Sequence, residues 1–123
     1  MIYGIGIDLV EIERIKKIVA RKGDSFLQKI FSEQEIALCP IADDKKIEYL
    51  AGRFAAKEAV AKAFGTGIGR DLGWREIVIL KNERGKPYVI LAKPGYENEG
   101  FRIHLSISHT NSLAVAKAII EQI

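Results

Sequence analysis

Two carboxylates and a group of cations have the types and spacing that could do chemistry in this sequence. Asp8 follows an apolar run near the N-terminus, and Glu58 lies in a short stretch that also contains Arg53, Lys57 and Lys62. Two carboxylates are the minimum that holds a hard divalent cation, and Mg²⁺ prefers one or two of them, completed by water and substrate phosphates. Cations beside Glu58 would serve phosphate oxygens that a bare carboxylate repels. The pattern therefore points to phosphoryl chemistry.

Each of these residues also has a purely structural interpretation. Glu58 and Lys62 are spaced as an i, i+4 ion pair on a solvated helix face, and from this stretch alone the two interpretations are equally good. Asp8 could cap a following helix, which stabilises a helix by about 1 kcal/mol, and taken alone this is the favoured interpretation. The sequence has no Cys/His cluster for zinc and no spacing that builds a Ser-His-Asp triad, so metal-free hydrolysis has little support.

The stretch 48–64 is predicted to be the helix that positions Glu58. Alanine is the best helix former, and Gly65 supplies a left-handed stop. At about 100° per residue, one arc is apolar and nearly all methyl-sized, so the helix can lie very close to a sheet. That arc holds Ala55, Ala56, Ala59, Val60 and Ala63. The opposite, mainly polar arc holds Arg53, Phe54, Lys57, Glu58, Ala61 and Lys62.

Residues 2–10 are predicted to form the strand that carries Asp8. Two glycines on one strand face leave room for a close neighbour, and the methyl-faced helix would fit there. Alternation puts Gly4, Gly6 and Asp8 on that face. The other face holds Tyr3, Ile5, Ile7 and Leu9.

Residues 11–22 are predicted to form an amphipathic helix with a basic stripe. Arg14, Lys17 and Arg21 recur at i, i+3 and i+7 beside Ile18. The stripe suits docking of an acidic partner helix, although basic helix faces are more often simply hydrated. The apolar side holds Ile12, Ile15, Ile18 and Val19.

Shorter elements connect these two helices. Residues 26–30 are predicted to form an apolar turn or short helix, with Asp24 or Ser25 as its N-cap. Ser32, three residues before a glutamate, is typical of a capping box and predicts another short helix. Residues 41–46 are interpreted as a charged connector.

Four glycines in residues 65–73 follow the central helix. Backbone here can approach a ligand closely and present N–H groups to an anion. The segment is not a Walker loop, because no Gly-Lys-Ser/Thr follows and because it trails a helix. A flexible connector is an equally good interpretation.

The C-terminal half is predicted to form two β-hairpins. One pairs strands at 74–80 and 88–91, and the other pairs strands at 101–108 and 113–120. One face of the strand at 101–108 is wholly polar and contains His104. That face is either a solvated edge or the polar wall of a ligand groove.

Length and composition limit the classes of protein that fit. The 123 residues suffice for one domain, 1–123, but are few for a self-contained cleft, so the site could be shared between subunits. The net charge of +3 suits nucleic acid, a phosphorylated ligand or an acidic protein. No apolar run reaches the length of a membrane span, no basic leader is present, and the lone Cys39 cannot form an internal disulfide. We therefore expect a cytosolic protein with no membrane contact.

The sequence resembles the small bacterial holo-acyl-carrier-protein synthases, members of the 4′-phosphopantetheinyl transferases. The likeness runs in order from Met1 to about Ile120, and its Phe-x-x-Lys-Glu block with a distant upstream Asp is specific to the superfamily. The matching segments are Ile5-Gly6-Ile7-Asp8, Arg53-Phe54-Ala55-Ala56-Lys57-Glu58-Ala59, Lys62-Ala63-Phe64-Gly65-Thr66-Gly67-Ile68-Gly69, Gly85-Lys86-Pro87 and Ser106-Ile107-Ser108-His109.

This resemblance implies transfer of 4′-phosphopantetheine from coenzyme A to a serine of an apo acyl carrier protein, in fatty acid biosynthesis, with release of adenosine 3′,5′-bisphosphate. It implies that Asp8 and Glu58 hold Mg²⁺ and that Lys62, with Lys57 or Arg53, stabilises the departing bisphosphate. The serine proton would pass to Glu58 or to a metal-held water, and the sequence does not decide between them.

The implied fold is a compact α+β domain with a long alanine-rich helix packed on a mainly antiparallel sheet, assembled as a homotrimer with each coenzyme A groove between neighbours. The residues expected at coenzyme A are Arg53, Phe54, Lys57, Ala61, Gly65, Thr66, His104 and Ser106. Carrier proteins are acidic, and the residues expected to dock them are Arg14, Lys17, Ile18, Arg21 and Phe26. His109 lies in a matching segment but, as a turn residue, receives no chemical role.

Two other functions fit the same residues less well. A basic module could grip RNA through its cationic side chains, but most of the five Phe and four Tyr fall on core-type positions, so few remain to stack on bases. We therefore expect no nucleic acid partner. A metal-dependent phosphodiesterase could use Asp8 and Glu58. Neither alternative predicts a covalent adduct on a carrier protein.

Overall fold

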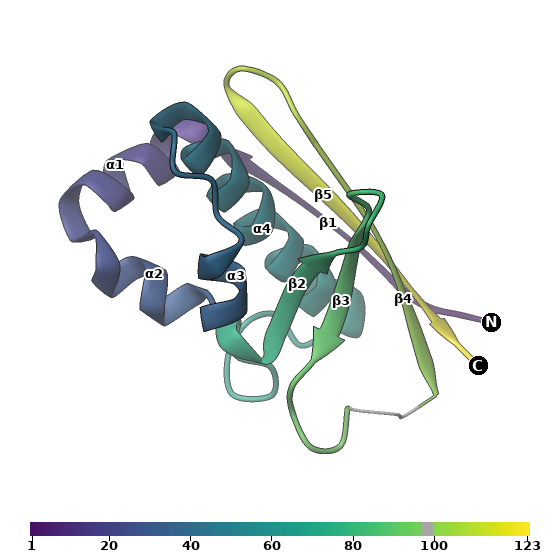
Figure 1. Ribbon diagram of the computed structural model, residues 1–123. Coiled ribbons are helices and arrows are strands. Elements are labelled where there is room, and N and C mark those ends of the chain that lie inside the picture. The colour runs from purple at the N-terminus through teal and green to yellow at the C-terminus, as the bar shows by residue number, and fades with distance from the viewer. Residues whose placement is uncertain (97–99) are drawn as a thin grey trace.

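Helix α4 (Asp43–Phe64) lies between two layers of the computed structural model, which describes residues 1–96 and 100–123 (Figure 1). A three-stranded antiparallel sheet covers one side, in the order β1-β5-β4. The short helices lie on the other side, and a two-stranded hairpin flanks the edge strand β4 of the sheet. In chain order the remaining elements are β1 (Ile2–Glu11), α1 (Ile12–Lys22), α2 (Asp24–Ile30), α3 (Glu33–Ala37), the 3₁₀ turn η1 (Trp74–Glu76), β2 (Ile77–Lys81), β3 (Pro87–Leu91), β4 (Phe101–His109) and β5 (Leu113–Gln122).

The α+β architecture and both predicted hairpins are confirmed. Strand β2 pairs with β3, and β4 pairs with β5, antiparallel in each case. The N-terminal strand β1 pairs along β5, so the two ends of the chain lie side by side (Figure 1). This return makes β5 the central strand of the sheet that packs on α4.

Strand β1 and helix α4 pack with almost nothing between their backbones. A methyl group added at Gly4 would overlap the carbonyl oxygen of Ala63, and one at Gly6 would overlap that of Ala59. The expected close approach between the glycine face and the methyl-sized arc is therefore confirmed. Because strand side chains alternate, Asp8 lies on this same inner face.

The other face of β1 is apolar and exposed. Ile5, Ile7 and Leu9 are each about 60% exposed, at 60%, 58% and 61%. Tyr3 departs from the predicted alternation at the register shift between Ile2 and Gly4, since its ring packs 5.0 Å from that of Phe101.

Several predicted boundaries are wrong. Helix α4 begins at Asp43, so most of the supposed connector 41–46 is helical, with acidic residues in the first turn where they favour the helix dipole. Helix α2 has Gly23 as its N-cap and no side-chain cap, so neither Asp24 nor Ser25 caps it. The 3₁₀ turn η1 replaces the start of the strand predicted at residue 74.

The capping box at Ser32 is confirmed. The Ser32 backbone N–H donates to Glu35 Oε1 at 2.8 Å, and the Glu35 N–H donates to Ser32 Oγ at 3.2 Å. This box begins α3 and holds the Glu35 carboxylate inside the protein, where its side chain has no solvent exposure.

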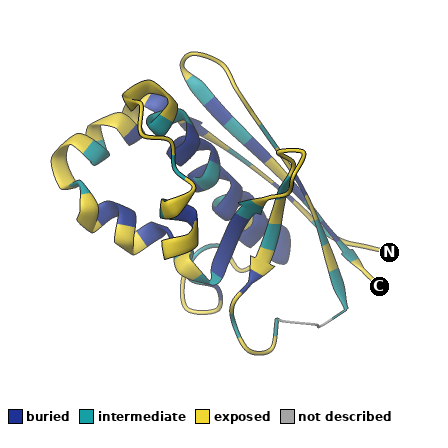
Figure 2. Cartoon of the chain, in the orientation of Figure 1, coloured by how far each residue is buried: buried dark blue, intermediate teal, exposed yellow. Residues whose placement is uncertain are grey.

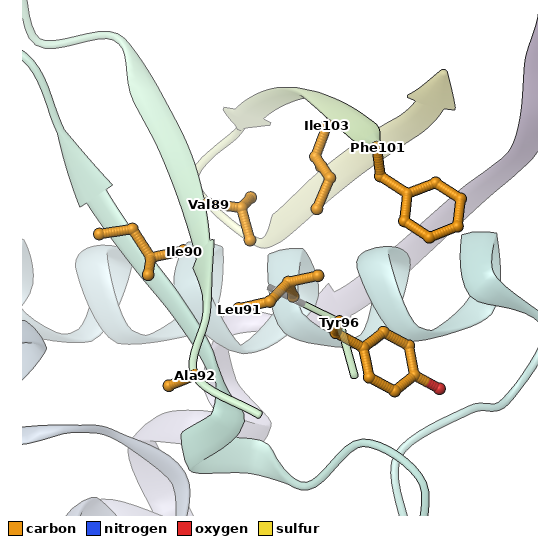
Figure 3. Close-up of a pocket in the computed structure, with 7 residues that line it drawn as sticks. All are labelled: Val89, Ile90, Leu91, Ala92, Tyr96, Phe101 and Ile103. Atoms are coloured by element: carbon orange, nitrogen blue, oxygen red, sulfur yellow. The ribbon is translucent and has the colours of Figure 1, made fainter. Parts of the chain in front are cut away.

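A pocket of about 510 Å³ lies between β3 and β4. Figure 3 shows Val89 and Leu91 of β3 on one side and Phe101 and Ile103 of β4 on the other. None of the described residues that line it is charged, so it offers no cation to a phosphate group.

No helix formed by residues 1–96 and 100–123 is both long enough and apolar enough to cross a membrane.

The tight contact between β1 and α4 makes a direct prediction. Gly6→Ala should lower the free energy of unfolding by about 1–3 kcal/mol or more, because the new methyl group must push α4 away from the sheet. Urea denaturation measures this. Gly69→Ala is the matched control, since a Cβ at Gly69 meets no atom within 4 Å. Equal stability of the two variants would contradict the packing described.

Candidate active site

Asp8, Glu58 and Lys62 come together where β1 crosses α4. Lys62 Nζ lies 2.9 Å from Asp8 Oδ1 and donates to the Ile7 carbonyl oxygen at 3.2 Å. Asp8 in turn acts on Glu58, because its negative charge raises the pKa of the Glu58 carboxyl. The structural interpretations of Asp8 and Lys62 are therefore wrong. Helix α1 has Glu11 as its N-cap, and Lys62 pairs with Asp8.

The pKa of Glu58 reports the electrostatics of this cluster. Burial raises that pKa most, and the Asp8 charge raises it further, while Lys62 and Arg14 oppose the increase. The negative charges of Asp8 and Glu58 therefore oppose each other in a partly desolvated site. A site of this kind gains from a bound cation.

The donor set fits magnesium better than zinc. Within the described residues, no group of three or more His, Cys, Asp or Glu side chains gathers as a metal cluster. Two carboxylates suit a hard divalent ion that takes its other oxygen ligands from water and substrate phosphates.

Arg14 lies at the edge of this cluster. Its guanidinium sits over the Phe54 ring, 5.9 Å from the ring centroid, and its charge lowers the pKa of Glu58. Lys17 and Arg21 are exposed on the same helix, and Ile18 is half-buried. Phe26 is only 8% exposed and packs against other aromatic rings, so its predicted place on an exposed docking face is wrong.

The predicted polar arc of α4 is largely inside the protein. Figure 2 shows that α4 is buried along most of its length, because layers cover it on both sides. Phe54 is 7% exposed and stacks on Trp74, with ring centroids 4.8 Å apart. Ala61 is fully buried, and its carbonyl oxygen accepts hydrogen bonds from the backbone of Thr66 and Gly67. The expectation of an exposed arc at these positions is wrong.

Lys57 is the largest departure from the sequence prediction. Its side chain has no solvent exposure, and Nζ donates to Glu35 Oε1 at 2.7 Å, to Trp74 O at 2.9 Å and to Ile77 O at 2.6 Å. Burial lowers the pKa of Lys57, and the Glu35 carboxylate opposes that effect. An ammonium has three donors, so none remains for a phosphate of coenzyme A.

Arg53 is half-buried in a small pocket. Its guanidinium lies over the Tyr49 ring, 4.4 Å from the centroid, and its buried Nε has no hydrogen-bond partner among the described residues. His109 lines the same pocket and lies 3.8 Å from Glu48 Oε2. The structure thus places His109 beside a cation with a free donor, although the sequence assigned it no role.

His104 and Ser106 lie on the opposite face of the sheet from α4. Both are exposed, and His104 Nε2 is 3.1 Å from Glu121 Oε1. Asp8 lies on the inner face, so a single chain does not bring His104 and Ser106 to Glu58. Gly65 and Thr66 are exposed where α4 ends, a few residues beyond Lys62.

Sequence reasoning missed Glu35 and Tyr49 and the contact of Arg14 with Phe54. Glu35 carries a visible signal only as the last residue of a capping box, which does not reveal that it also binds Lys57. Tyr49 donates to the Glu35 carbonyl oxygen at 2.6 Å, a contact between distant residues that no local pattern shows.

Known proteins that resemble this chain in sequence and fold are transferases. The profile of the 4′-phosphopantetheinyl transferase superfamily matches residues 4–118. A holo-[acyl-carrier-protein] synthase from Bacillus subtilis is 44% identical over 124 residues, which cover 100% of this chain and 98% of that protein. One from Chlorobaculum parvum is 46% identical over 117 residues, which cover 95% of this chain and 97% of that protein.

Solved structures agree with this similarity. The crystal structure of a holo-(acyl-carrier-protein) synthase from Bacillus anthracis in complex with CoA (3′,5′-ADP) matches with a TM-score of 0.87 and 40% identity, covering 99% of this chain and 98% of that one. The Helicobacter pylori synthase in complex with coenzyme A matches with a TM-score of 0.85 and 37% identity, covering 95% and 99%.

Proposed function

This chain belongs to the 4′-phosphopantetheinyl transferase superfamily, and from that premise we propose that it transfers 4′-phosphopantetheine from coenzyme A to a serine of an apo acyl carrier protein. The product left behind is adenosine 3′,5′-bisphosphate. The observation that carries the proposal is the meeting of Asp8, Glu58 and Lys62 at the crossing of β1 and α4. The relatives solved with coenzyme A support its first substrate.

Asp8 and Glu58 would hold Mg²⁺ in this enzyme. Burial raises the pKa of Glu58 and the Asp8 charge raises it further, so the negative charge of the two carboxylates fits a divalent ion. When bound, Mg²⁺ supplies polarisation of the phosphoryl oxygens and neutralises charge on the pyrophosphate.

Lys62 and Glu58 supply the remaining chemistry from one face of α4. Lys62 is half-exposed and already oriented toward Asp8, so its ammonium can donate to an oxygen of the departing bisphosphate. The serine proton passes to Glu58 or to a metal-held water as the serine oxygen attacks phosphorus.

The nucleotide part of coenzyme A would lie along residues beyond this centre. Gly65 and Thr66 begin an exposed loop next to Lys62, where the backbone can approach a phosphate. The Arg53 guanidinium lies at the pocket that His109 also lines, so its positive charge can attract a further anionic group. Lys57, Phe54 and Ala61 support these residues from inside the protein.

The enzyme would assemble as a homotrimer with each site between neighbours. The exposed apolar face of β1 supports self-association, since Ile5, Ile7 and Leu9 are each close to 60% exposed. His104 and Ser106 share that outer sheet face, so they can reach a site of an adjoining chain although they cannot reach Glu58 of their own.

The carrier protein would dock on α1. Arg14, Lys17 and Arg21 present positive charge to an acidic carrier, with Ile18 beside them. Since Arg14 also borders the Glu58 cluster, a carrier held there has its serine near the reacting phosphorus. We place this single domain, 1–123, in the cytoplasm and in fatty acid biosynthesis.

Transfer is tested by the mass of the carrier. An apo acyl carrier protein incubated with coenzyme A, Mg²⁺ and enzyme should gain the mass of phosphopantetheine, and EDTA should prevent the gain. Glu58→Gln should lower the rate at least about a hundredfold, because it removes the charge of a carboxylate that would hold the ion. Glu33→Gln is the control. Glu33 is an exposed residue of α3, so this variant should remain active. An unmodified carrier, or hydrolysis of coenzyme A alone, would contradict the proposal.

Docking is tested by charge reversal on α1. Arg21→Glu should raise the KM for the carrier about tenfold at low salt and leave the affinity for coenzyme A unchanged, because Arg21 lies on the basic stripe. Lys16→Glu makes the same charge change on the opposite side of α1. If both variants lose the same affinity, net charge and not the stripe attracts the carrier.

The trimer is tested by sedimentation equilibrium. The wild type should show the mass of three chains, and Ile7→Glu should shift the distribution toward single chains, because it introduces charge into the exposed apolar face. A wild type that sediments as one chain would exclude a site shared between subunits.

A further inference from the structure

The buried ion pair of Lys57 and Glu35 has no part in the chemistry described above, yet it adjoins the catalytic glutamate in sequence. We infer that Lys57 is a positioning residue. Through its hydrogen bonds to Trp74 and Ile77, it holds the glycine loop, residues 65–73, against α4. Through Trp74 it also holds the Phe54 ring that lies under Arg14. The effect on coenzyme A rests on the proposed function, whereas the effect on the loop does not.

Every polar atom of the pair is occupied. Lys57 Nζ donates to Glu35 and to the carbonyl oxygens of Trp74 and Ile77. Glu35 also accepts from the backbone N–H groups of Ser32, at 2.8 Å, and Ile79, at 2.8 Å. The network therefore joins α3, α4 and β2 at one point. A fully bonded buried pair contributes little net stability compared with an apolar pair, so geometry is the stronger reason for its presence.

The two carbonyl groups that Lys57 binds bracket the 3₁₀ turn η1. This turn directly follows the glycine loop, so Lys57 fixes the C-terminal end of that loop. The N-terminal end is fixed by the cap of the same helix, where the Gly65 N–H donates to Lys62 O at 2.9 Å and the Gly67 N–H donates to Ala61 O at 3.2 Å. Both ends of the loop are therefore held by α4, at positions about 6–8 Å apart along its axis.

The contacts of Lys57 also connect to Arg14, through the rings of Trp74 and Phe54. Trp74, whose carbonyl oxygen Lys57 binds, stacks on Phe54 at 4.8 Å between centroids. The guanidinium of Arg14 lies 5.9 Å from the centroid of that same Phe54 ring. Release of the Trp74 backbone would loosen the ring that supports Arg14, on the side of the site where a carrier would dock.

The test compares two variants that break the ion pair in different ways. Lys57→Met removes the hydrogen bonds to Trp74 and Ile77, whereas Glu35→Gln leaves Lys57 able to make them. The double variant Glu35→Gln/Lys57→Met removes the unpaired buried charge that could unfold Lys57→Met. Loss of one charge-assisted hydrogen bond corresponds to about tenfold in an equilibrium constant.

In the ligand-free chain, hydrogen exchange of amides in the glycine loop and η1 should rise about tenfold in both Lys57 variants relative to Glu35→Gln. Acrylamide should quench the fluorescence of Trp74, the single tryptophan, more strongly in the same two proteins. Calorimetry should show that the dissociation constant for coenzyme A is about tenfold higher in the two Lys57 variants. Hydrogen exchange should show that the β5 amides of these variants remain protected.

If hydrogen exchange rises uniformly across all elements, or if loop exchange is unchanged in the double variant, the Lys57–Glu35 pair only stabilises the fold and Lys57 does not position the loop. If loop exchange rises in the Lys57 variants but the wild type transfers no phosphopantetheine, the positioning role stands and the proposed function is overturned. Faster loop exchange with unchanged coenzyme A affinity would remove the loop from the binding site.

Discussion

The near-contact of two backbones organises this protein. Gly4 and Gly6 let β1 approach the carbonyl groups of Ala63 and Ala59 with no side chain between them. Two residues further along the same strand face, Asp8 therefore meets the side chains of α4 at short range. A larger residue at either glycine would separate the carboxylate of the strand from the cluster on the helix. The same close packing of β1 on α4 thus determines both the core and the position of the Asp8 charge.

Burial of α4 on both sides sorts its charged residues by environment. Lys62 turns outward to Asp8, Arg53 lines a pocket, and Lys57 enters the core. Glu58 is half-buried between these extremes, and burial together with Asp8 raises its pKa. In the proposed mechanism, one helix would therefore supply a metal-binding carboxylate, a cation for the leaving group and an internal anchor, because each side chain meets a different degree of solvation.

Sequence alone predicted what local patterns determine. The capping box at Ser32, both hairpins and the methyl-sized arc of α4 depend on neighbouring residues and are confirmed. A helical wheel shows which residues share a face but not how many faces are covered, so it could not show that Lys57, expected at coenzyme A, points into the core. For the same reason, the sequence pattern did not show that Phe26 is buried. His109 and Arg53 are far apart in the chain, and only the folded structure brings them to one pocket.

Magnesium binding between β1 and α4 is the central requirement of the proposed mechanism. A crystal of the enzyme grown with coenzyme A and Mn²⁺, with anomalous scattering recorded at the manganese edge, locates the ion directly. We predict one ion that contacts the carboxylates of both Asp8 and Glu58 and the pyrophosphate of coenzyme A. An ion bound elsewhere, or ligated by neither carboxylate, would contradict the mechanism proposed for this chain.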